Sequence, residues 1–201
     1  RGHLNETDRS GLVARYVGHT AVKVREVFDQ ADQGVLLIDE AYALARGGEN
    51  DFGMEAIDAI VKLVEDRRKS MVCIAAGYPV EMREFVDANP GLRSRFPKVI
   101  EFPDYDTDEL VEIFELIAAK SHYEADEGGF DAIRAWIDAQ PRTKGFGNGR
   151  LARNLFESAV ARQATRIVRV DDPTDEQLVT LTVEDIPAPD ESLDHREDVP
   201  E

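Results

Sequence analysis

The sequence predicts an α/β fold built on a parallel sheet and followed by a small all-α subdomain. Two continuous apolar segments, Val35–Ile38 and Met71–Ala76, are typical of strands buried on both faces inside such a sheet. Helical patterns of ten or more residues alternate with these segments, as in α/β folds. After Pro103 the pattern becomes helical, which predicts a second subdomain made of helices.

The first half of the chain is expected to alternate strands with helices. Apolar residues that recur at i, i+3, i+4 and i+7 predict one helix over 21–32 and another whose apolar stripe begins at Met54. A short helix is expected from Pro79, which suits the first helical position, to Ala88, and Asn89-Pro90-Gly91 then ends it. The expected strands are an edge strand within residues 2–7, then Val35–Ile38, Met71–Ala76 and Lys98–Phe102.

The second half carries helix signals and an acidic end. Asp106 and Glu109 have the spacing of a capping box, which predicts the start of a helix. Asn148 is placed to cap a long helix that runs from Arg150 to about Arg169. The last fifteen residues hold six acids and almost nothing apolar, which is typical of a disordered tail. The expected units are the α/β subdomain at 1–103, a helical subdomain at 104–186 and the tail at 187–201.

Composition argues against several classes of partner. The net charge of −17 disfavours a nucleic-acid surface and an anionic membrane surface, because both need clustered Lys and Arg. No apolar run approaches the length of a membrane helix, and no signal peptide is evident, so no membrane insertion is expected. Cys73 is the only cysteine, which fits a cytoplasmic, reducing location. The sequence begins with Arg1 and not Met, so we expect residues upstream of it.

Two acids, Asp39 and Glu40, directly follow the strand predicted at Val35–Ile38. The carboxyl ends of parallel strands form the edge at which open α/β sheets bind ligands. An aspartate there can hold Mg²⁺ on a nucleotide, and an adjacent glutamate can polarise an attacking water. The simpler alternative is a strand that runs into an ordinary acidic turn. The neighbouring motifs favour the nucleotide interpretation.

Four motifs occur in an order that resembles the AAA+ ATPases. They are Tyr16-Val17-Gly18, VLLIDEAYAL at 35–44, NPGLRSRF at 89–96 and GNGRLARNLF at 147–156. Within that superfamily the chain looks most like the SpoVK/CbbX branch. This branch includes red-type Rubisco activases and the ATPases associated with type VII secretion. The resemblance covers about residues 2–186 and implies a parallel-sheet AAA+ core followed by a small all-α lid subdomain.

The resemblance also implies roles for particular residues. Asp39 would contact the Mg²⁺ of ATP, and Glu40 would activate the hydrolytic water. Arg93 and Arg95 lie where such ATPases present an arginine finger to the neighbouring subunit, and we favour Arg95 because a finger is expected directly before Phe96. The remaining implied residues are Tyr16, Val17 and Gly18 as the first pore loop of a hexamer, Arg150 as the sensor-2 arginine, and Arg153 as the second choice for that role.

The chain departs from the family pattern in two places. The polar sensor-1 residue would fall near Gly77, which has no side chain, so either Tyr78 substitutes or the role has moved. No Walker A motif is present, because no lysine follows a glycine. The resemblance implies that the P-loop and the first core strand lie upstream, with that strand between Met71–Ala76 and Lys98–Phe102. Residues 1–201 alone are therefore expected to be unstable, to bind Mg-ATP barely and not to hydrolyse it.

The motifs favour an ATP-dependent protein-remodelling ATPase that hydrolyses ATP at the subunit interfaces of a homo-oligomeric ring. Its client would be a protein of unknown identity. The alternative is a non-catalytic AAA-like assembly or adaptor module, against which the intact Glu40 and both finger candidates argue. A helicase of the DEAD/DEAH type, suggested by Asp39-Glu40-Ala41, is disfavoured because the expected Ser-Ala-Thr motif is missing and the net charge is negative.

Overall fold

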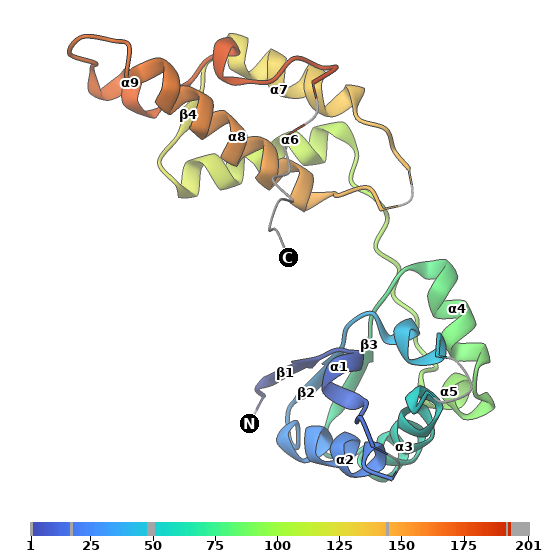
Figure 1. Ribbon diagram of the computed structural model, residues 1–201. Coiled ribbons are helices and arrows are strands. Elements are labelled where there is room, and N and C mark those ends of the chain that lie inside the picture. The colour runs from blue at the N-terminus through green and yellow to red at the C-terminus, as the bar shows by residue number, and fades with distance from the viewer. Residues whose placement is uncertain (1, 17, 48–50, 144, 192, 194–201) are drawn as a thin grey trace. The chain divides into compact units, whose positions relative to one another are not determined.

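A computed structural model of the chain describes residues 2–16, 18–47, 51–143, 145–191 and 193 (Figure 1). The chain divides into two compact units, Arg1–Glu101 and Phe102–Glu201. The first unit holds a parallel sheet with helices, and the second consists mainly of helices (Figure 1). Among the described residues, no helix combines the length and the apolar character needed to cross a membrane.

The sheet of the first unit has three parallel strands in the order β1-β2-β3. The strands are β1 (Leu4–Thr7), β2 (Val35–Ile38) and β3 (Val72–Ala75). Their register aligns the first residues of all three strands and also the last. The predicted edge strand within residues 2–7 and both apolar strands are therefore confirmed, and β2 lies in the middle.

Only one face of this sheet is fully covered. Leu36 and Ile38 of β2 are completely buried and belong to the same core as Phe28 and Ile57, which come from the helices against that face. The helices of the unit are α1 (Arg9–Leu12), α2 (Thr20–Gln30), the 3₁₀ helix η1 (Ala41–Ala45), α3 (Gly53–Asp66), α4 (Pro79–Asp87) and α5 (Pro90–Arg95). The opposite face leaves Leu4, Val72 and Ile74 about half exposed, so the prediction that β2 is buried on both faces is wrong for the second face.

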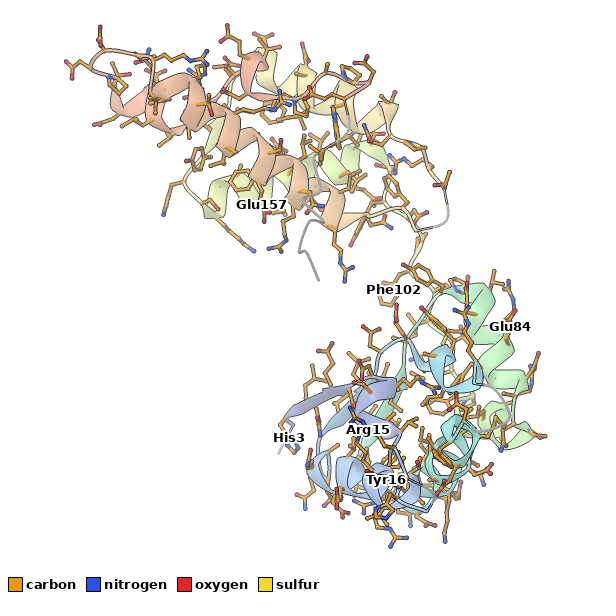
Figure 2. All side chains as sticks on the ribbon, in the orientation of Figure 1. His3, Arg15, Tyr16, Glu84, Phe102 and Glu157 are labelled. Carbon is orange, nitrogen blue, oxygen red and sulfur yellow. The ribbon has the colours of Figure 1, made fainter. Side chains whose placement is uncertain are left out.

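Two further predictions for this unit are wrong. Residues 98–102 form no strand, and Val99, Ile100 and Phe102 are 64–88% exposed (Figure 2). A strand needs a hydrogen-bonded neighbour, and no described segment pairs with these residues. Met54 is 44% exposed, because it lies in the first turn of α3 beyond the stripe that faces the core.

Cys73 of β3 packs against the same core. Burial raises the pKa of its thiol to about 12, because the apolar surroundings disfavour the charged thiolate.

The second unit is a helical group with its own core. Its elements are α6 (Thr107–Lys120), β4 (Glu124–Ala125), α7 (Glu127–Ala139), α8 (Gly149–Ile167), α9 (Asp175–Val179), β5 (Thr180–Leu181) and the 3₁₀ helix η2 (Val183–Asp185). Leu110, Phe114, Trp136 and Leu155 are buried at its centre. The predicted capping box of α6 is confirmed, since Asp106 and Glu109 each accept the other's backbone N–H at 2.9 Å. The short parallel pair β4–β5 means that the unit is not purely helical.

Asn148 stands at the N-cap position of α8, but its side chain does not cap the helix. Its Oδ1 accepts the backbone N–H of Tyr105 at 2.9 Å, and its Nδ2 donates to Asp104 at 2.7 Å. The predicted capping bond is therefore wrong, because the amide binds the segment that precedes α6.

The ordered chain continues past the boundary predicted at residue 186. Trp136 Nε1 donates to the backbone oxygen of Glu191 at 3.0 Å, and the Glu191 carboxylate forms an ion pair with Arg162. Leu193 also packs against the core of the unit. The rest of the predicted acidic tail, Ser192 and residues 194–201, lies outside the described residues.

A buried ion pair joins α8 to η2 within the second unit. The Asp185 carboxylate is completely buried and accepts hydrogen bonds from Arg166 Nε at 2.9 Å and Nη2 at 2.8 Å. It also accepts the backbone N–H of Thr182 at 2.8 Å. Burial acts to raise the pKa of Asp185, but the hydrogen bonds from Arg166 and Thr182 outweigh it and lower that pKa overall.

We expect Asp185→Asn to reduce the free energy of unfolding of this unit by about 2–3 kcal/mol, because Arg166 loses a buried charged partner. Trp136 is the only tryptophan of the chain, so its emission during urea titration reports on this unit. The lowered pKa means that the ionised carboxylate stabilises the fold above the unfolded value of 3.8. The difference between wild type and variant should therefore shrink as the pH falls below about 3.8.

Asp190→Asn is the matched control, because Asp190 is exposed and the same substitution there should leave the urea midpoint unchanged. Equal effects of the two variants would contradict the stabilising role of the buried pair.

Candidate functional site

The acids that follow β2 lie in a turn tied to both neighbouring strands. Asp39 N donates to the carbonyl of Thr7 at the end of β1 at 2.8 Å. Ala41 N donates to the carbonyl of Ala76, just after β3, at 3.0 Å. The side chains of Asp39 and Glu40 are exposed at the carboxyl edge of the sheet, where the sequence predicts a ligand site.

Glu40 adopts a left-handed backbone conformation, with φ 46° and ψ 41°. Such a conformation costs a residue with a side chain about 1 kcal/mol or more, so the surrounding structure must hold it. Asp39 Oδ1 accepts the N–H of Glu40 at 2.9 Å, and the Glu40 carbonyl accepts the N–H of Ala43 at 2.8 Å. The turn thus redirects the chain from β2 into η1 while both carboxylates stay at the sheet edge.

The chemistry of this pair fits a cation that arrives with its own anionic ligand. Carboxylate oxygens suit Mg²⁺, which commonly takes one or two carboxylates together with phosphate oxygens and water. Among the described residues, no group of three or more His, Cys, Asp or Glu side chains could hold a metal alone. Asp39 therefore fits as one ligand of a Mg²⁺ that a nucleotide carries, and Glu40 lies beside it.

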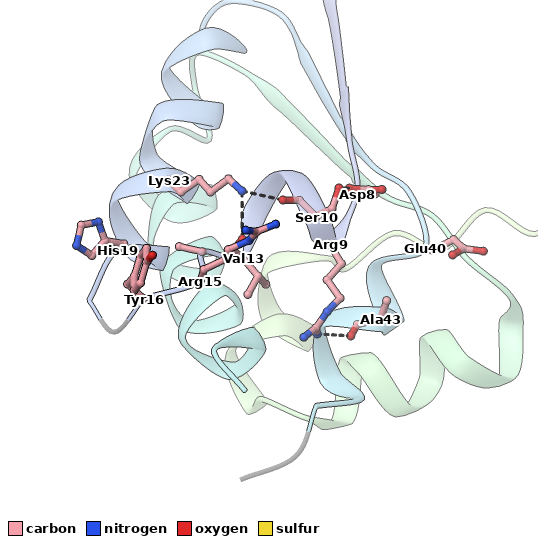
Figure 3. Close-up of a pocket in the computed structure, with 11 residues that line it drawn as sticks. Asp8, Arg9, Ser10, Val13, Arg15, Tyr16, His19, Lys23, Glu40 and Ala43 are labelled. Atoms are coloured by element: carbon pink, nitrogen blue, oxygen red, sulfur yellow. Dashed lines mark hydrogen bonds between the residues drawn. The ribbon is translucent and has the colours of Figure 1, made fainter. Parts of the chain in front are cut away.

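A hollow of about 880 Å³ opens between α1, the following loop and Glu40 (Figure 3). Arg9 donates to the carbonyl of Ala43 at 2.7 Å and to both carboxylate oxygens of Asp51 at 2.6 Å. Hydrogen bonding to Arg9 lowers the pKa of Asp51. Lys23 donates to two backbone carbonyls of the α1 segment, as the dashed lines in Figure 3 show. Arg9 and Lys23 thus form hydrogen bonds with other segments of the protein at the wall of this hollow.

Of the predicted pore-loop residues, Tyr16 lines this hollow. Tyr16 is 72% exposed, and its ring meets that of His19 edge-on at 6.2 Å between centroids (Figures 2 and 3). Gly18 has φ 77°, a conformation that favours glycine and permits the tight turn. Val17 lies outside the described residues. The loop before α2 therefore presents an aromatic side chain to solvent.

The two candidate finger arginines occupy different environments in the last turn of α5. Asn89 caps this helix by accepting the N–H of Gly91 at 2.7 Å. The side chain of Arg93 is 72% exposed and forms an ion pair with Asp87. The side chain of Arg95 is 32% exposed, and its Nε lies 3.0 Å from a carboxylate oxygen of Glu65 on α3. Arg93 is thus the more accessible arginine, and Arg95 is tied to its own unit.

Arg150 and Arg153, the sensor-2 candidates, belong to the first turns of α8 in the second unit. Both side chains are exposed. Within the described part of the chain, neither guanidinium forms an ion pair. Each can therefore accept an anionic partner.

Tyr42 is a residue that the sequence did not single out. It lies two residues after Glu40 in η1 and is 8% exposed. A Cβ on Gly77 would lie 2.7 Å from its ring, so Tyr42 fills the space where the sensor-1 side chain was sought. Tyr78, the substitute that the sequence suggested, is 47% exposed. No sequence periodicity predicts the contact between Tyr42 and Gly77, because the two residues lie 35 positions apart.

Two protein families match most of this chain. Residues 2–104 match the family described as ATPase family associated with various cellular activities (AAA), and residues 106–196 match the AAA lid domain. The chain is 41% identical over 189 residues to stage V sporulation protein K of Bacillus subtilis (strain 168). This alignment covers 92% of the present chain and 59% of the sporulation protein. It is 41% identical over 191 residues to protein CbbX of Cereibacter sphaeroides, and this alignment covers 94% of the present chain and 62% of CbbX.

The chain thus spans about three-fifths of the length of these curated relatives. A solved structure of a RuvB mutant from Thermotoga maritima has the same fold, with a TM-score of 0.61 at 16% identity over 90% of this chain and 50% of that one. The predicted α/β core and helical lid are confirmed by these matches. The chain belongs to the AAA ATPase family, in a branch with the SpoVK and CbbX proteins.

Proposed function

We propose that this chain is part of an ATP-hydrolysing ring that remodels a client protein. The observation that carries the proposal is the acid pair Asp39-Glu40, held by the left-handed turn at the carboxyl edge of the sheet. Membership of the AAA ATPase family supports nucleotide hydrolysis as the chemistry. The phosphate-binding loop that this function needs is not found in the present sequence, and we assign it to residues upstream.

In the proposed reaction the Glu40 carboxylate accepts a proton from water while the water oxygen bonds to the terminal phosphorus of ATP. The bond from that phosphorus to the bridging oxygen breaks, which yields ADP and phosphate. Mg²⁺, bound to the phosphates and to Asp39, would neutralise their charge. Arg150, or Arg153 one turn later, would contact the phosphates from the lid domain of the same subunit.

The proposed ring places each nucleotide between two subunits. An arginine of α5 would then meet the phosphates bound by the neighbouring subunit, where its fixed charge and forked donors suit phosphate oxygens. We assign this role to Arg95, with Arg93 as the alternative. A homo-oligomer follows from this division of the site between subunits, and the family resemblance implies a hexamer.

The proposed client is a polypeptide gripped by Tyr16, Val17 and Gly18. Support comes from the solvent exposure of Tyr16 in the loop before α2 and from the net charge of −17, which disfavours nucleic acid. Rubisco, a secretion substrate and other proteins all remain candidate clients. We assign the ring to the cytoplasm on the basis of the single cysteine.

Glu40→Gln in the full-length protein should lower the rate of ATP hydrolysis by about 100-fold or more, because an amide cannot accept the proton of the water. Nucleotide affinity should stay within about threefold, since the shape and the Asp39 carboxylate are kept. Phosphate release and titration with a fluorescent nucleotide measure the two quantities. Glu84→Gln, on the exposed surface of α4 (Figure 2), is the control that should retain full activity. Unchanged hydrolysis in Glu40→Gln would contradict the catalytic role of Glu40, whereas no hydrolysis by the wild-type protein would favour the non-catalytic adaptor alternative.

Arg95→Ala should lower turnover by about 10³-fold, the usual effect of losing an arginine finger. Mixing Arg95→Ala subunits with Glu40→Gln subunits should restore part of the activity, because an intact Arg95 can then face an intact Glu40 across an interface. Arg93→Ala is the matched variant two positions away. If Arg93→Ala reproduces both results and Arg95→Ala does neither, the finger is Arg93.

Tyr16→Ala should reduce binding of a fluorescein-labelled unfolded polypeptide by about tenfold, because an aromatic anchor of this kind contributes over 1 kcal/mol. Basal ATP hydrolysis should change less than twofold, since the loop is expected to contact the client and not the nucleotide. Tyr16→Phe should keep most of the binding. A parallel loss of hydrolysis and binding in Tyr16→Ala would contradict the pore-loop assignment.

A further inference from the structure

The side chain of Asn148 joins the segment before α6 to the loop before α8, and the two lie side by side in Figure 1. Its Oδ1 accepts the backbone N–H of Tyr105 at 2.9 Å. Its Nδ2 donates to Asp104 Oδ1 at 2.7 Å and to the carbonyl of Phe146 at 3.1 Å. A backbone N–H can only donate, and an ionised carboxylate and a carbonyl can only accept. Each end of the amide therefore faces partners of the matching kind.

Arg142 binds the same segment from the other end of the loop. Its guanidinium donates to the carbonyl of Tyr105 and, at 3.1 Å, to Oγ1 of Thr107. It also lies over the ring of Phe146, 4.3 Å from the centroid, within cation–π range. Side chains of the loop before α8 thus bind both backbone groups of Tyr105. These contacts of Asn148 and Arg142 make the segment before α6 part of the helical unit.

The backbone of Asn148 has an unfavourable conformation, with φ 46° and ψ −125°. A residue with a side chain keeps such a conformation only where the surrounding structure holds it. The Asn148 carbonyl accepts the N–H of Leu151 at 2.9 Å, and the Gly147 carbonyl accepts the N–H of Arg150 at 2.9 Å. Asn148 therefore sets the direction in which α8 begins, while its side chain is bound to the segment before α6.

We propose that Asn148 is a positioning residue for Arg150. It joins the first turn of α8, which carries Arg150, to residues 104 and 105. The exposed side chain of Arg150 forms no ion pair within the described chain, so its position follows that of the helical turn beneath it. The guanidinium is thereby held in place for a phosphate before the nucleotide binds. The inference rests on the proposed function, in which Arg150 contacts the phosphates of ATP.

The first test is Asn148→Gly in the full-length protein, because glycine adopts this backbone conformation without strain while the side-chain contacts are lost. Amide hydrogen exchange at Tyr105 in the nucleotide-free protein should become about tenfold faster or more, since its N–H loses the acceptor. Affinity for a fluorescent, non-hydrolysable ATP analogue should fall about fivefold, part of the roughly tenfold loss expected on removing an arginine–phosphate contact. Unchanged exchange or unchanged affinity would each overturn the inference.

An exchange of two side chains separates positioning from a general effect on folding. Asn148→Asp alone places two carboxylates against each other, so nucleotide affinity should fall at least as far as in Asn148→Gly. Adding Asp104→Asn restores a carboxylate–amide pair and keeps the acceptor of Tyr105, so affinity should return to within about threefold of wild type. Asp171→Asn is the matched control, because this exposed acid lies beyond the other end of α8 and should restore nothing. Restoration by both additions, or by neither, would overturn the inference.

Arg150→Ala and Glu40→Gln, measured in the same series, separate the inference from the proposed function. If Arg150→Ala weakens binding of the analogue, adding Asn148→Gly should cause no further loss, because the positioned group is already gone. Multiplied losses, or a loss in Arg150→Ala with none in Asn148→Gly, would overturn the inference and leave the proposed function standing. If Arg150→Ala leaves binding unchanged while Glu40→Gln abolishes hydrolysis, the positioning role fails and the catalytic role of Glu40 stands.

Discussion

The pairing of β2 with strands on both of its sides is the constraint on which the candidate site depends. Hydrogen bonds from the turn after β2 to Thr7 and Ala76 use the ends of both neighbouring strands. They fix the place at which the chain leaves the sheet, and the left-handed conformation of Glu40 then sets the direction in which η1 begins. Tyr42 lies in this short helix, and its ring packs against Gly77.

The sequence predicted well where the determining interactions are local. The apolar run of β2, the helical periodicity of α2 and the capping box of α6 all involve residues at most a few positions apart. It failed for residues 98–102, where strand formation depends on a pairing partner that no local pattern contains. For Asn148 the backbone position was right, but the amide binds Asp104 and Tyr105, more than 40 positions away.

The same distinction holds within the candidate site. Asp39 and Glu40 could be predicted because they adjoin the strand that positions them. The environments of Arg93 and Arg95 could not, because the difference between them depends on where Asp87 and Glu65 lie in the fold. Tyr42 was missed for a similar reason. Its ring packs against Gly77, which follows β3 and is distant from Tyr42 in the sequence.

The partly buried thiol of Cys73 has a practical consequence for spectroscopy. Alkylating dyes react with thiolates, and a group with a pKa of about 12 is almost entirely protonated at neutral pH. Because this is the only sulfhydryl of the sequence, a cysteine introduced at an exposed position such as Arg15 should be labelled selectively without removing the native one. Fluorophores on the loop before α2 could then report its motion during nucleotide turnover.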